Sequence, residues 1–234
     1  MIYKPKKTKL KILKESCKDY KGVVALDFDG TITNEVSLDL IGEAAGLSEK
    51  IKELTHLGLN GDITWMDSLK NRLELLKGFP VSKIEEIAYN IELSPGAKEL
   101  VDQLRAMDYA VGIISGGTEI IVGRTAKCLD VDFYIGNEFE VEEGKLTGGY
   151  RLNVNSNKDE LLNQAKDYFS ADFSVAVGDG YNDLPMLFAA DLGIAFCAKE
   201  NVKKKVPVKI EERDLTKVVE KIRKDRQHAE QKRE

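Results

Sequence analysis

Short apolar runs alternate with amphipathic segments along most of this 234-residue chain. The apolar runs span residues 23–26, 110–114, 173–177 and 192–195. Runs of this length are typical of strands buried on both faces, as in a parallel sheet covered by helices. Helical patterns such as residues 96–107 lie between them, so the elements follow the order of repeated βαβ units. The pattern predicts an α/β fold with a doubly wound, mainly parallel, Rossmann-like sheet that gathers polar strand ends at one edge.

One long segment, from residue 34 to residue 90, carries no strand pattern and instead predicts several amphipathic helices. Thr64 and Asp67 form a typical helix start. Beyond it, apolar residues recur at steps of three and four and are predicted to face a core: Met66, Leu69, Leu73 and Leu76. Because the segment is far longer than an ordinary connection, we expect a helical cap that follows the first strand and covers the strand-edge site.

The remaining segments complete the predicted organisation. Residues 138–152 alternate polar and apolar positions around Glu143-Gly144-Lys145, which predicts a hairpin. Residues 1–21 contain eight lysines and are expected to form a solvated leader, whereas the tail from Lys217 onward is expected to form a terminal helix. The predicted parts are a lysine-rich leader (1–21), an α/β core (22–33 and 91–234) and a cap (34–90).

Composition excludes several classes of protein. The chain is 42% hydrophobic with a formal net charge of −5, which fits a folded chain with a sizeable core. No apolar run approaches the roughly 20 residues that span a bilayer, and the leader lacks the apolar centre of a secretory signal. We therefore expect a cytoplasmic protein without a membrane partner. The acidic balance, without a basic face interleaved with aromatic residues, argues against a nucleic-acid partner.

The few cysteines and histidines narrow the chemistry. Cys17, Cys128 and Cys197 lie far apart and form no CxxC pair, which argues against a disulfide framework or a structural zinc site. The sequence contains only two histidines, His56 and His228, so Ser–His–Asp hydrolysis and His-rich zinc catalysis are not expected. Any chemistry must then rest on carboxylates, Lys, Ser or Thr hydroxyls and backbone amides.

The strongest chemical signal is Asp27-Phe28-Asp29-Gly30-Thr31, directly after the first apolar run. Side chains two apart on a strand point the same way, so both carboxylates are predicted to face one small volume. Such a pair is useful when one carboxylate attacks and the other transfers protons. A calcium loop would need a third ligand at Thr31 and would follow a helix. A helix N-cap would explain Asp29 alone, and chance acidic residues at a strand end would explain either.

Three further elements carry weaker signals. Ser115-Gly116-Gly117-Thr118 ends the second apolar run and is expected to open a helix, where a hydroxyl and backbone amides can hold an anion. Strand–glycine–helix turns are also common without any ligand. Lys158 has the alternative of a solvated helix start. Gly178-Asp179-Gly180-Tyr181-Asn182-Asp183 offers oxygen ligands to a hard cation, although an ordinary Asp/Gly turn would look similar.

Taken in order, the motifs DxDGT, SGG, Lys and GDGxND resemble the haloacid dehalogenase superfamily of aspartyl-phosphate phosphatases. The helical insertion after the first motif resembles the phosphoserine phosphatase branch of that superfamily. The resemblance covers roughly residues 22–215. It implies an Mg²⁺-dependent phosphomonoester hydrolase that acts on a small molecule through an aspartyl phosphate.

The resemblance also implies a role for each matching position. Asp27 is expected to be the nucleophile, and Asp29 is expected to protonate the leaving group and then to activate water. The expected phosphate-binding residues are Thr31, Ser115, Gly116, Lys158 and Asn182. The expected Mg²⁺ ligands are Asp27, the main-chain oxygen of Asp29, Asp179 and, in support, Asp183.

Substrate choice is expected to come from the cap. The resemblance places Arg72 where it can bind a substrate carboxylate, and Trp65 as an apolar wall, although helix-surface and core positions explain both residues equally well. The branch uses a glutamate for the amino group at the position that Val36 occupies here, with Glu35 one residue early. O-phospho-L-serine is the first expectation. The alternatives are a phosphoethanolamine-like or sugar phosphate, a phosphotransferase and, remotely, a non-catalytic phospho-Asp signalling module.

Overall fold

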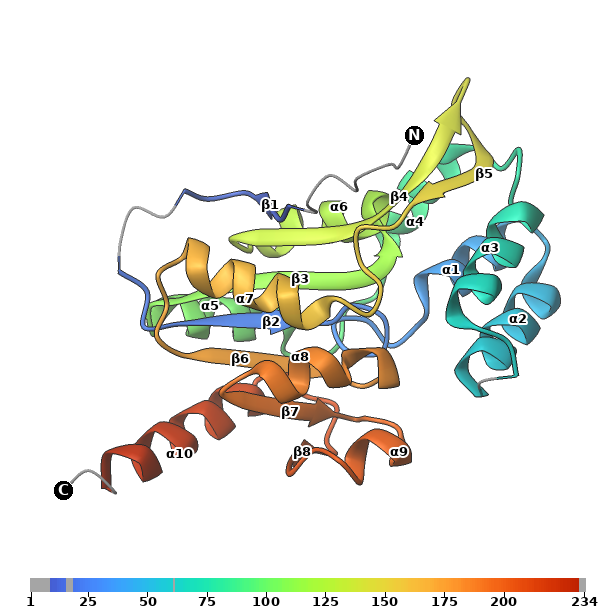
Figure 1. The fold of residues 1–234 in the computed structure, drawn as a ribbon. Coiled ribbons are helices and arrows are strands. Elements are labelled where there is room, and N and C mark those ends of the chain that lie inside the picture. The colour runs from blue at the N-terminus through green and yellow to red at the C-terminus, as the bar shows by residue number, and fades with distance from the viewer. Residues whose placement is uncertain (1–8, 16–18, 61, 232–234) are drawn as a thin grey trace, which may run out of the picture.

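A mainly parallel β-sheet forms the centre of the computed structural model, which describes residues 9–15, 19–60 and 62–231 (Figure 1). Its strand order is β1-β4-β3-β2-β6-β7-β8, and β5 pairs with β4 outside this path. The strands are β1 (Lys11–Ile12), β2 (Gly22–Leu26), β3 (Tyr109–Thr118), β4 (Phe133–Glu142), β5 (Lys145–Arg151), β6 (Ser174–Gly178), β7 (Leu192–Phe196) and β8 (Val208–Ile210). This arrangement confirms the predicted α/β fold class.

The helices cover both faces of the sheet and extend beyond one end of it (Figure 1). They are α1 (Ser37–Ala44), α2 (Ser48–Asn60), α3 (Trp65–Leu75), α4 (Val81–Asn90), α5 (Ala97–Ala106), α6 (Glu119–Leu129), α7 (Lys158–Tyr168), α8 (Leu184–Ala189), α9 (Glu200–Lys203) and α10 (Lys217–Gln231). Helices α5, α6 and α10 contribute to the core on one face, and α7 and α8 contribute to the core on the other.

Strand β2 shows why the apolar runs form buried strands. It pairs in parallel with β3 on one side and with β6 on the other, and all of its residues are buried. Val24 and Leu26 join one core, whereas Val23 and Ala25 join the other, because successive side chains point to opposite faces. The four predicted runs are confirmed as β2, β3, β6 and β7. However, β3 continues through Thr118, so Ser115–Thr118 lies in a strand and the following helix begins at Glu119.

The segment after β2 forms helices α1 to α4, as predicted. Thr64 caps α3, since its hydroxyl oxygen accepts a hydrogen bond from the Asp67 amide at 3.0 Å. Leu69, Leu73 and Leu76 are buried as expected. Met66 is 53% exposed, so its predicted core position is wrong. It lies in the first turn of α3, where the helix borders an open cavity instead of the core.

The two chain crossings between this helical segment and the sheet lie side by side. Thr33 and Leu93 form an antiparallel bridge, and the Ser94 amide donates to the Ile32 carbonyl at 2.7 Å. The buried Ser94 hydroxyl also donates to the Thr31 carbonyl at 2.7 Å. These bonds fix where the chain leaves the sheet and where it returns.

The hairpin prediction is confirmed, because β4 and β5 pair antiparallel around a turn at Glu143 and Gly144, both with positive φ. The leader differs from the prediction. Residues 11–12 form β1, which pairs with the edge of β4, and Leu10 and Ile12 pack against the core. Pairing covers backbone groups that an edge strand would otherwise leave open. Residues 1–8 and 16–18, including Cys17, lie outside the described residues.

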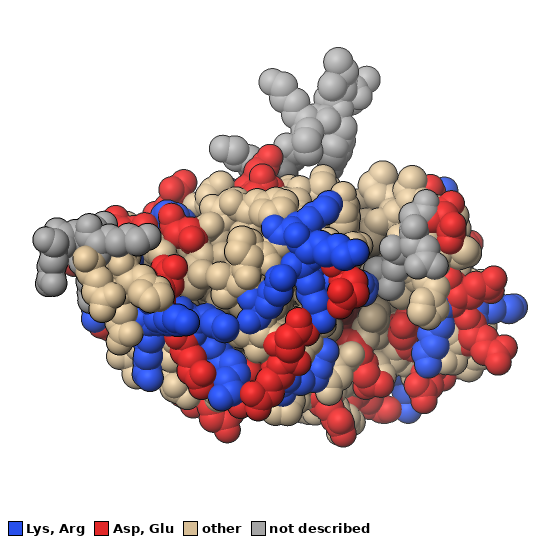
Figure 2. Space-filling model, turned by 90° about the horizontal axis from the view of Figure 1, so that it is seen from below, with Lys and Arg blue, Asp and Glu red and all other residues tan. Residues whose placement is uncertain are grey.

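The terminal helix prediction is confirmed by α10, whose Val218, Val219 and Ile222 are buried. Among the described residues, no helix is both long and apolar enough to cross a membrane. On the face shown in Figure 2, basic and acidic side chains intermingle over most of the described surface. That face therefore presents neighbouring charges of both signs.

Candidate active site

A cavity of about 340 Å³ lies at the carboxyl ends of the central strands, between the sheet and helices α1 to α3. Asp27 directly follows β2, Ser115 lies near the end of β3, and Asp179 directly follows β6. All three line the cavity, together with Asp29 and Asn182. The strand order brings these residues together, since β3, β2 and β6 are neighbours in the sheet.

Lys158, the first residue of α7, forms ion pairs with one residue of the first sequence motif and one residue of the last. Its Nζ lies 2.6 Å from Asp27 Oδ1 and 2.6 Å from Asp183 Oδ1, and its side chain is fully buried. Burial lowers the pKa of Lys158, but the charges of Asp183 and Asp27 outweigh burial and raise it. The ammonium group therefore remains charged between two carboxylates.

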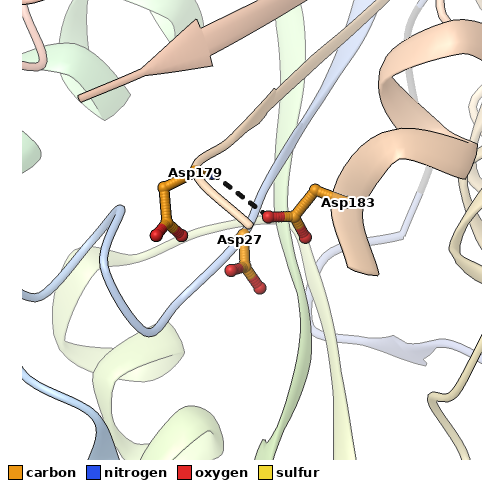
Figure 3. A group of neighbouring side chains, drawn as sticks. All are labelled: Asp27, Asp179 and Asp183. Atoms are coloured by element: carbon orange, nitrogen blue, oxygen red, sulfur yellow. Dashed lines mark hydrogen bonds between the residues drawn. The ribbon is translucent and has the colours of Figure 1, made fainter. Parts of the chain in front are cut away.

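Asp27, Asp179 and Asp183 form a cluster of carboxylates whose nearest oxygens all lie within 4.8 Å of one another. Figure 3 shows the three side chains close together, with the Asp183 carboxylate directed toward the other two residues. Burial, and then the charge of Asp183, raise the pKa of Asp27 well above its usual value. The same two causes raise the pKa of Asp179 to about 7. Crowded, buried carboxyl oxygens of this kind fit a divalent cation, which would compensate their charge.

The loops at the strand ends hold this cluster in place. Asp183 Oδ2 accepts hydrogen bonds from the amides of Asp179 at 3.1 Å and Gly180 at 2.8 Å. Gly30 has a φ of 85°, and a Cβ there would lie 2.6 Å from the carboxyl carbon of Asp179. Glycine is therefore required at position 30 for both conformation and space.

Asp29 is held by the start of α1. Its Oδ1 accepts a hydrogen bond from the Ser37 amide at 2.8 Å, and its Oδ2 lies 3.1 Å from the Ser37 hydroxyl. Burial raises the pKa of Asp29 to about 6, against the opposing effect of these Ser37 hydrogen bonds. A carboxyl group with a pKa near the working pH is suited to proton transfer. Asp29 thus contacts a helix N-terminus eight residues away and still lines the cavity.

Ser115 and Gly116 line the cavity from β3. The Ser115 hydroxyl oxygen accepts a hydrogen bond from the Gly117 amide at 2.9 Å. The ring of Trp65 covers Gly116, since a Cβ at position 116 would lie 3.2 Å from Trp65 Cζ2. The cavity therefore has a hydroxyl, a glycine backbone and an aromatic wall beside Asp27.

Arg72 reaches the cavity from α3 and is 5% exposed. Its Nε donates to the Ser68 carbonyl at 3.2 Å, and its Nη1 donates to the Thr55 hydroxyl at 3.2 Å. Thr55 in turn donates to Asp39 Oδ1 at 2.7 Å. Burial lowers the pKa of Arg72, whereas the charges of Asp39 and Asp29 raise it. The guanidinium group is thus anchored by a chain of hydrogen bonds across three helices.

Four of the predicted site residues do not line this cavity: Thr31, Glu35, Lys158 and Asp183. Thr31 is fully buried, and its hydroxyl has no partner among the described residues. Glu35 is exposed, and Val36 lines the cavity instead. Helix α1 begins directly after Val36, so Glu35 precedes the helix N-cap.

Sequence reasoning missed several residues of the site. Ser37 contacts Asp29 from the start of α1, and Thr55 of α2 contacts both Arg72 of α3 and Asp39 of α1. Arg213, far along the chain, donates through Nη1 to the Gly30 carbonyl at 3.2 Å and to Asn34 Oδ1 at 2.8 Å. Their spacing along the chain carries no recognisable signal.

Comparisons with known proteins identify relatives of this chain in sequence and in fold. A family model described as haloacid dehalogenase-like hydrolase matches residues 24–187. The phosphoserine phosphatase of Lactococcus lactis is 38% identical over 205 residues, which is 86% of this chain and 94% of that protein.

Two solved structures are similar over most of their length. A phospho-aspartyl intermediate analogue of phosphoserine phosphatase has a TM-score of 0.81 and 36% identity, covering 87% of this chain and 99% of that one. A substrate-bound phosphoserine phosphatase complex also has a TM-score of 0.81, with 35% identity over 87% of this chain and 98% of that one.

Proposed function

The chain belongs to the haloacid dehalogenase-like hydrolases, and we propose that it is an Mg²⁺-dependent phosphatase whose substrate is O-phospho-L-serine. One observation carries the proposal. Lys158 bridges Asp27 and Asp183 at 2.6 Å each, beside a cavity that Asp27 and Arg72 both line. Such a site has a nucleophile, cationic compensation for a phosphate group and a cation for a substrate carboxylate.

The reaction divides into two displacements at phosphorus. A carboxylate oxygen of Asp27 attacks the phosphorus, and the bond to the seryl oxygen breaks as Asp29 donates a proton to that oxygen. Asp29 then accepts a proton from water, which attacks the aspartyl phosphate and restores the Asp27 carboxylate. The hydrogen bonds from Ser37 hold Asp29 at the cavity for both steps.

The phosphoryl oxygens would be held by Lys158, Ser115, Asn182 and the backbone at Gly116, which all border the cavity or contact Asp27. Asp27, Asp179 and Asp183 would hold Mg²⁺, with the main-chain oxygen of Asp29 as a further ligand. When bound, Mg²⁺ supplies positive charge that compensates the phosphate dianion and the carboxylates.

Substrate recognition would come from residues 34–90 acting as a cap over a core of residues 22–33 and 91–234. Arg72 would pair with the substrate carboxylate, and Trp65 would exclude water from one side. Glu35 lies outside the cavity, whereas Asp39 lines it. Asp39 therefore takes the proposed role of holding the substrate ammonium group.

A different small phosphomonoester is the second candidate, and Val36 is the observation that favours it. Val36 lines the cavity as an apolar residue, which reduces the number of carboxylates available to an ammonium group. A sugar phosphate needs no such carboxylate. The first proposal still accounts better for Arg72, because a sugar phosphate has no carboxylate for it.

A phosphate-release assay with Mg²⁺ tests the proposal. The panel contains phosphoserine, phosphoethanolamine, phosphoglycolate and a sugar phosphate, and Asp27→Asn serves as the inactive control. We expect the highest kcat/KM with phosphoserine and a loss of at least about 10⁴-fold in the control. A higher kcat/KM for the sugar phosphate would reject phosphoserine as the substrate. Equal release by the control would reject Asp27 as the nucleophile.

A further inference from the structure

A second cavity, of about 550 Å³, opens beside the first. Three large apolar side chains surround it while remaining more than half exposed: Met66 at 53%, Tyr181 at 62% and Phe188 at 59%. Val154, Leu184 and Pro185 add to the apolar part of the lining, and polar residues such as Lys205 line the rest. A group of exposed apolar side chains around a cavity of this size is typical of a ligand-binding site.

The two cavities meet at the proposed phosphoryl site. Trp65, Gly116 and Asn182 line both of them. Because the Trp65 ring covers Gly116, this side chain forms the partition between the two spaces. Lys158, whose Nζ contacts Asp27, also lines the apolar cavity. A phosphate group at Asp27 could therefore direct its ester substituent to either side of Trp65.

The two sides of Trp65 suit different leaving groups. Asp29, Asp39 and Arg72 line the first cavity, and none of them is among the residues that line the apolar cavity in the described chain. An alkoxide needs a proton as it leaves, and Asp29 can provide it. A phenol has a pKa of about 10, like the tyrosine side chain, so an aryl oxide leaves without a general acid.

We propose that the apolar cavity is a second leaving-group site, which binds the aromatic ring of aryl phosphomonoesters while their phosphate group occupies the site at Asp27. This inference rests on the proposed phosphatase function. It adds a substrate class that lacks both the carboxylate and the ammonium group.

Hydrolysis of an aryl phosphate forms and breaks the same bonds at phosphorus as hydrolysis of phosphoserine. Asp27 forms a bond to phosphorus, the bond between phosphorus and the aryl oxygen breaks, and the aryl oxide keeps the electron pair and takes a proton from solvent water. Water then attacks the aspartyl phosphate, which restores Asp27 and releases phosphate. The sum is one aryl phosphate and one water giving one phenol and one phosphate.

The test compares two substrates in a double variant, Met66→Ser with Phe188→Ser. Both side chains are mostly exposed, so the protein is expected to stay folded. We expect kcat/KM for 2-naphthyl phosphate to fall about tenfold or more through lost apolar contact. The value for phosphoserine is expected to change by less than about twofold, because neither residue lines the first cavity. Val141→Ser is the control, since Val141 is 43% exposed and lines neither cavity.

The possible outcomes are distinct. A parallel loss on both substrates, or an unchanged kcat/KM for 2-naphthyl phosphate, would overturn the second leaving-group site. If the parent protein hydrolyses neither substrate, both the proposed phosphatase function and this inference are overturned.

Tryptophan fluorescence provides a second measurement that does not require turnover. Trp65 is the only tryptophan in the sequence, and it forms the wall of the apolar cavity. We expect 4-nitrophenol to quench its emission saturably, with a Kd that rises several-fold in the double variant and not in Val141→Ser. An identical Kd in all three proteins would contradict the assignment.

Discussion

The sheet edge and the helical segment contribute to the candidate active site in different ways. At the sheet edge, Asp27, Lys158 and Asp183 are buried and joined directly by ion pairs of 2.6 Å. In the helical segment, Arg72 is held indirectly, through the Thr55 hydroxyl and then Asp39. A rigid strand edge suits groups that must meet one phosphorus atom, whereas a chain of side chains on packed helices can vary with the substrate. The comparison suggests that chemistry and selectivity can be altered separately.

Lys158→Met should give the largest effect, because it removes the cation between two buried carboxylates. We expect kcat to fall about 10²–10³-fold on every phosphomonoester, as expected for loss of a group that stabilises the transition state. Steady-state kinetics with phosphoserine and an aryl phosphate would measure it. Lys83→Met is the matched control, since its ion pair with Glu86 lies at the surface. A loss confined to one substrate would place Lys158 in selectivity instead of chemistry.

Arg72→Ala should distinguish most clearly between the role of the helical segment in selectivity and the role of the sheet edge in chemistry. We expect KM for phosphoserine to rise about 10- to 100-fold, the range for loss of a charged hydrogen bond. The KM for an aryl phosphate should change far less, because that substrate has no carboxylate. Arg72→Lys keeps the charge but loses the fork-shaped donor pair, so its KM should lie between those of the parent and Arg72→Ala. Equal losses on both substrates would reject carboxylate recognition by Arg72.

Thr55→Val should give the smallest effect, because it removes the hydroxyl that contacts Arg72 and Asp39 but leaves both charged groups in place. We expect KM for phosphoserine to rise about three- to tenfold with little change in kcat, as for one uncharged hydrogen bond. Thr55→Ser keeps the hydroxyl and should restore KM. If Thr55→Val lowers thermal stability while KM stays at the parent value, Thr55 has only a structural role.

How far the sequence leads can be seen at particular residues. The apolar runs located β2, β3, β6 and β7, because a strand buried on both faces needs a continuous apolar sequence. The same runs located Asp27 and Asp179, which follow their strands directly. The pattern did not reveal that β3 continues to Thr118, since Ser115–Thr118 contains polar residues and glycines that are untypical of a strand.

The leader and Met66 show where local pattern fails. Lysines around Leu10 and Ile12 indicated solvent, yet this segment pairs with β4, because an open strand edge is a feature of the fold and not of the leader. Met66 fits the helical period of its neighbours, but the cavity next to the first turn of α3 leaves it exposed. In both cases, residues distant in the sequence determined the surroundings of the leader segment and of Met66.

The sequence by itself determined the order of strands and helices and the motifs that end the strands, because burial patterns and turn residues act over a few positions. Only the tertiary structure decided that Ser37 holds Asp29, that Asp39 lines the cavity while Glu35 does not, and that Trp65 lines two cavities. Those relations depend on how helices pack across the sheet edge. Packing of this kind joins residues whose separation in the chain carries no periodic signal.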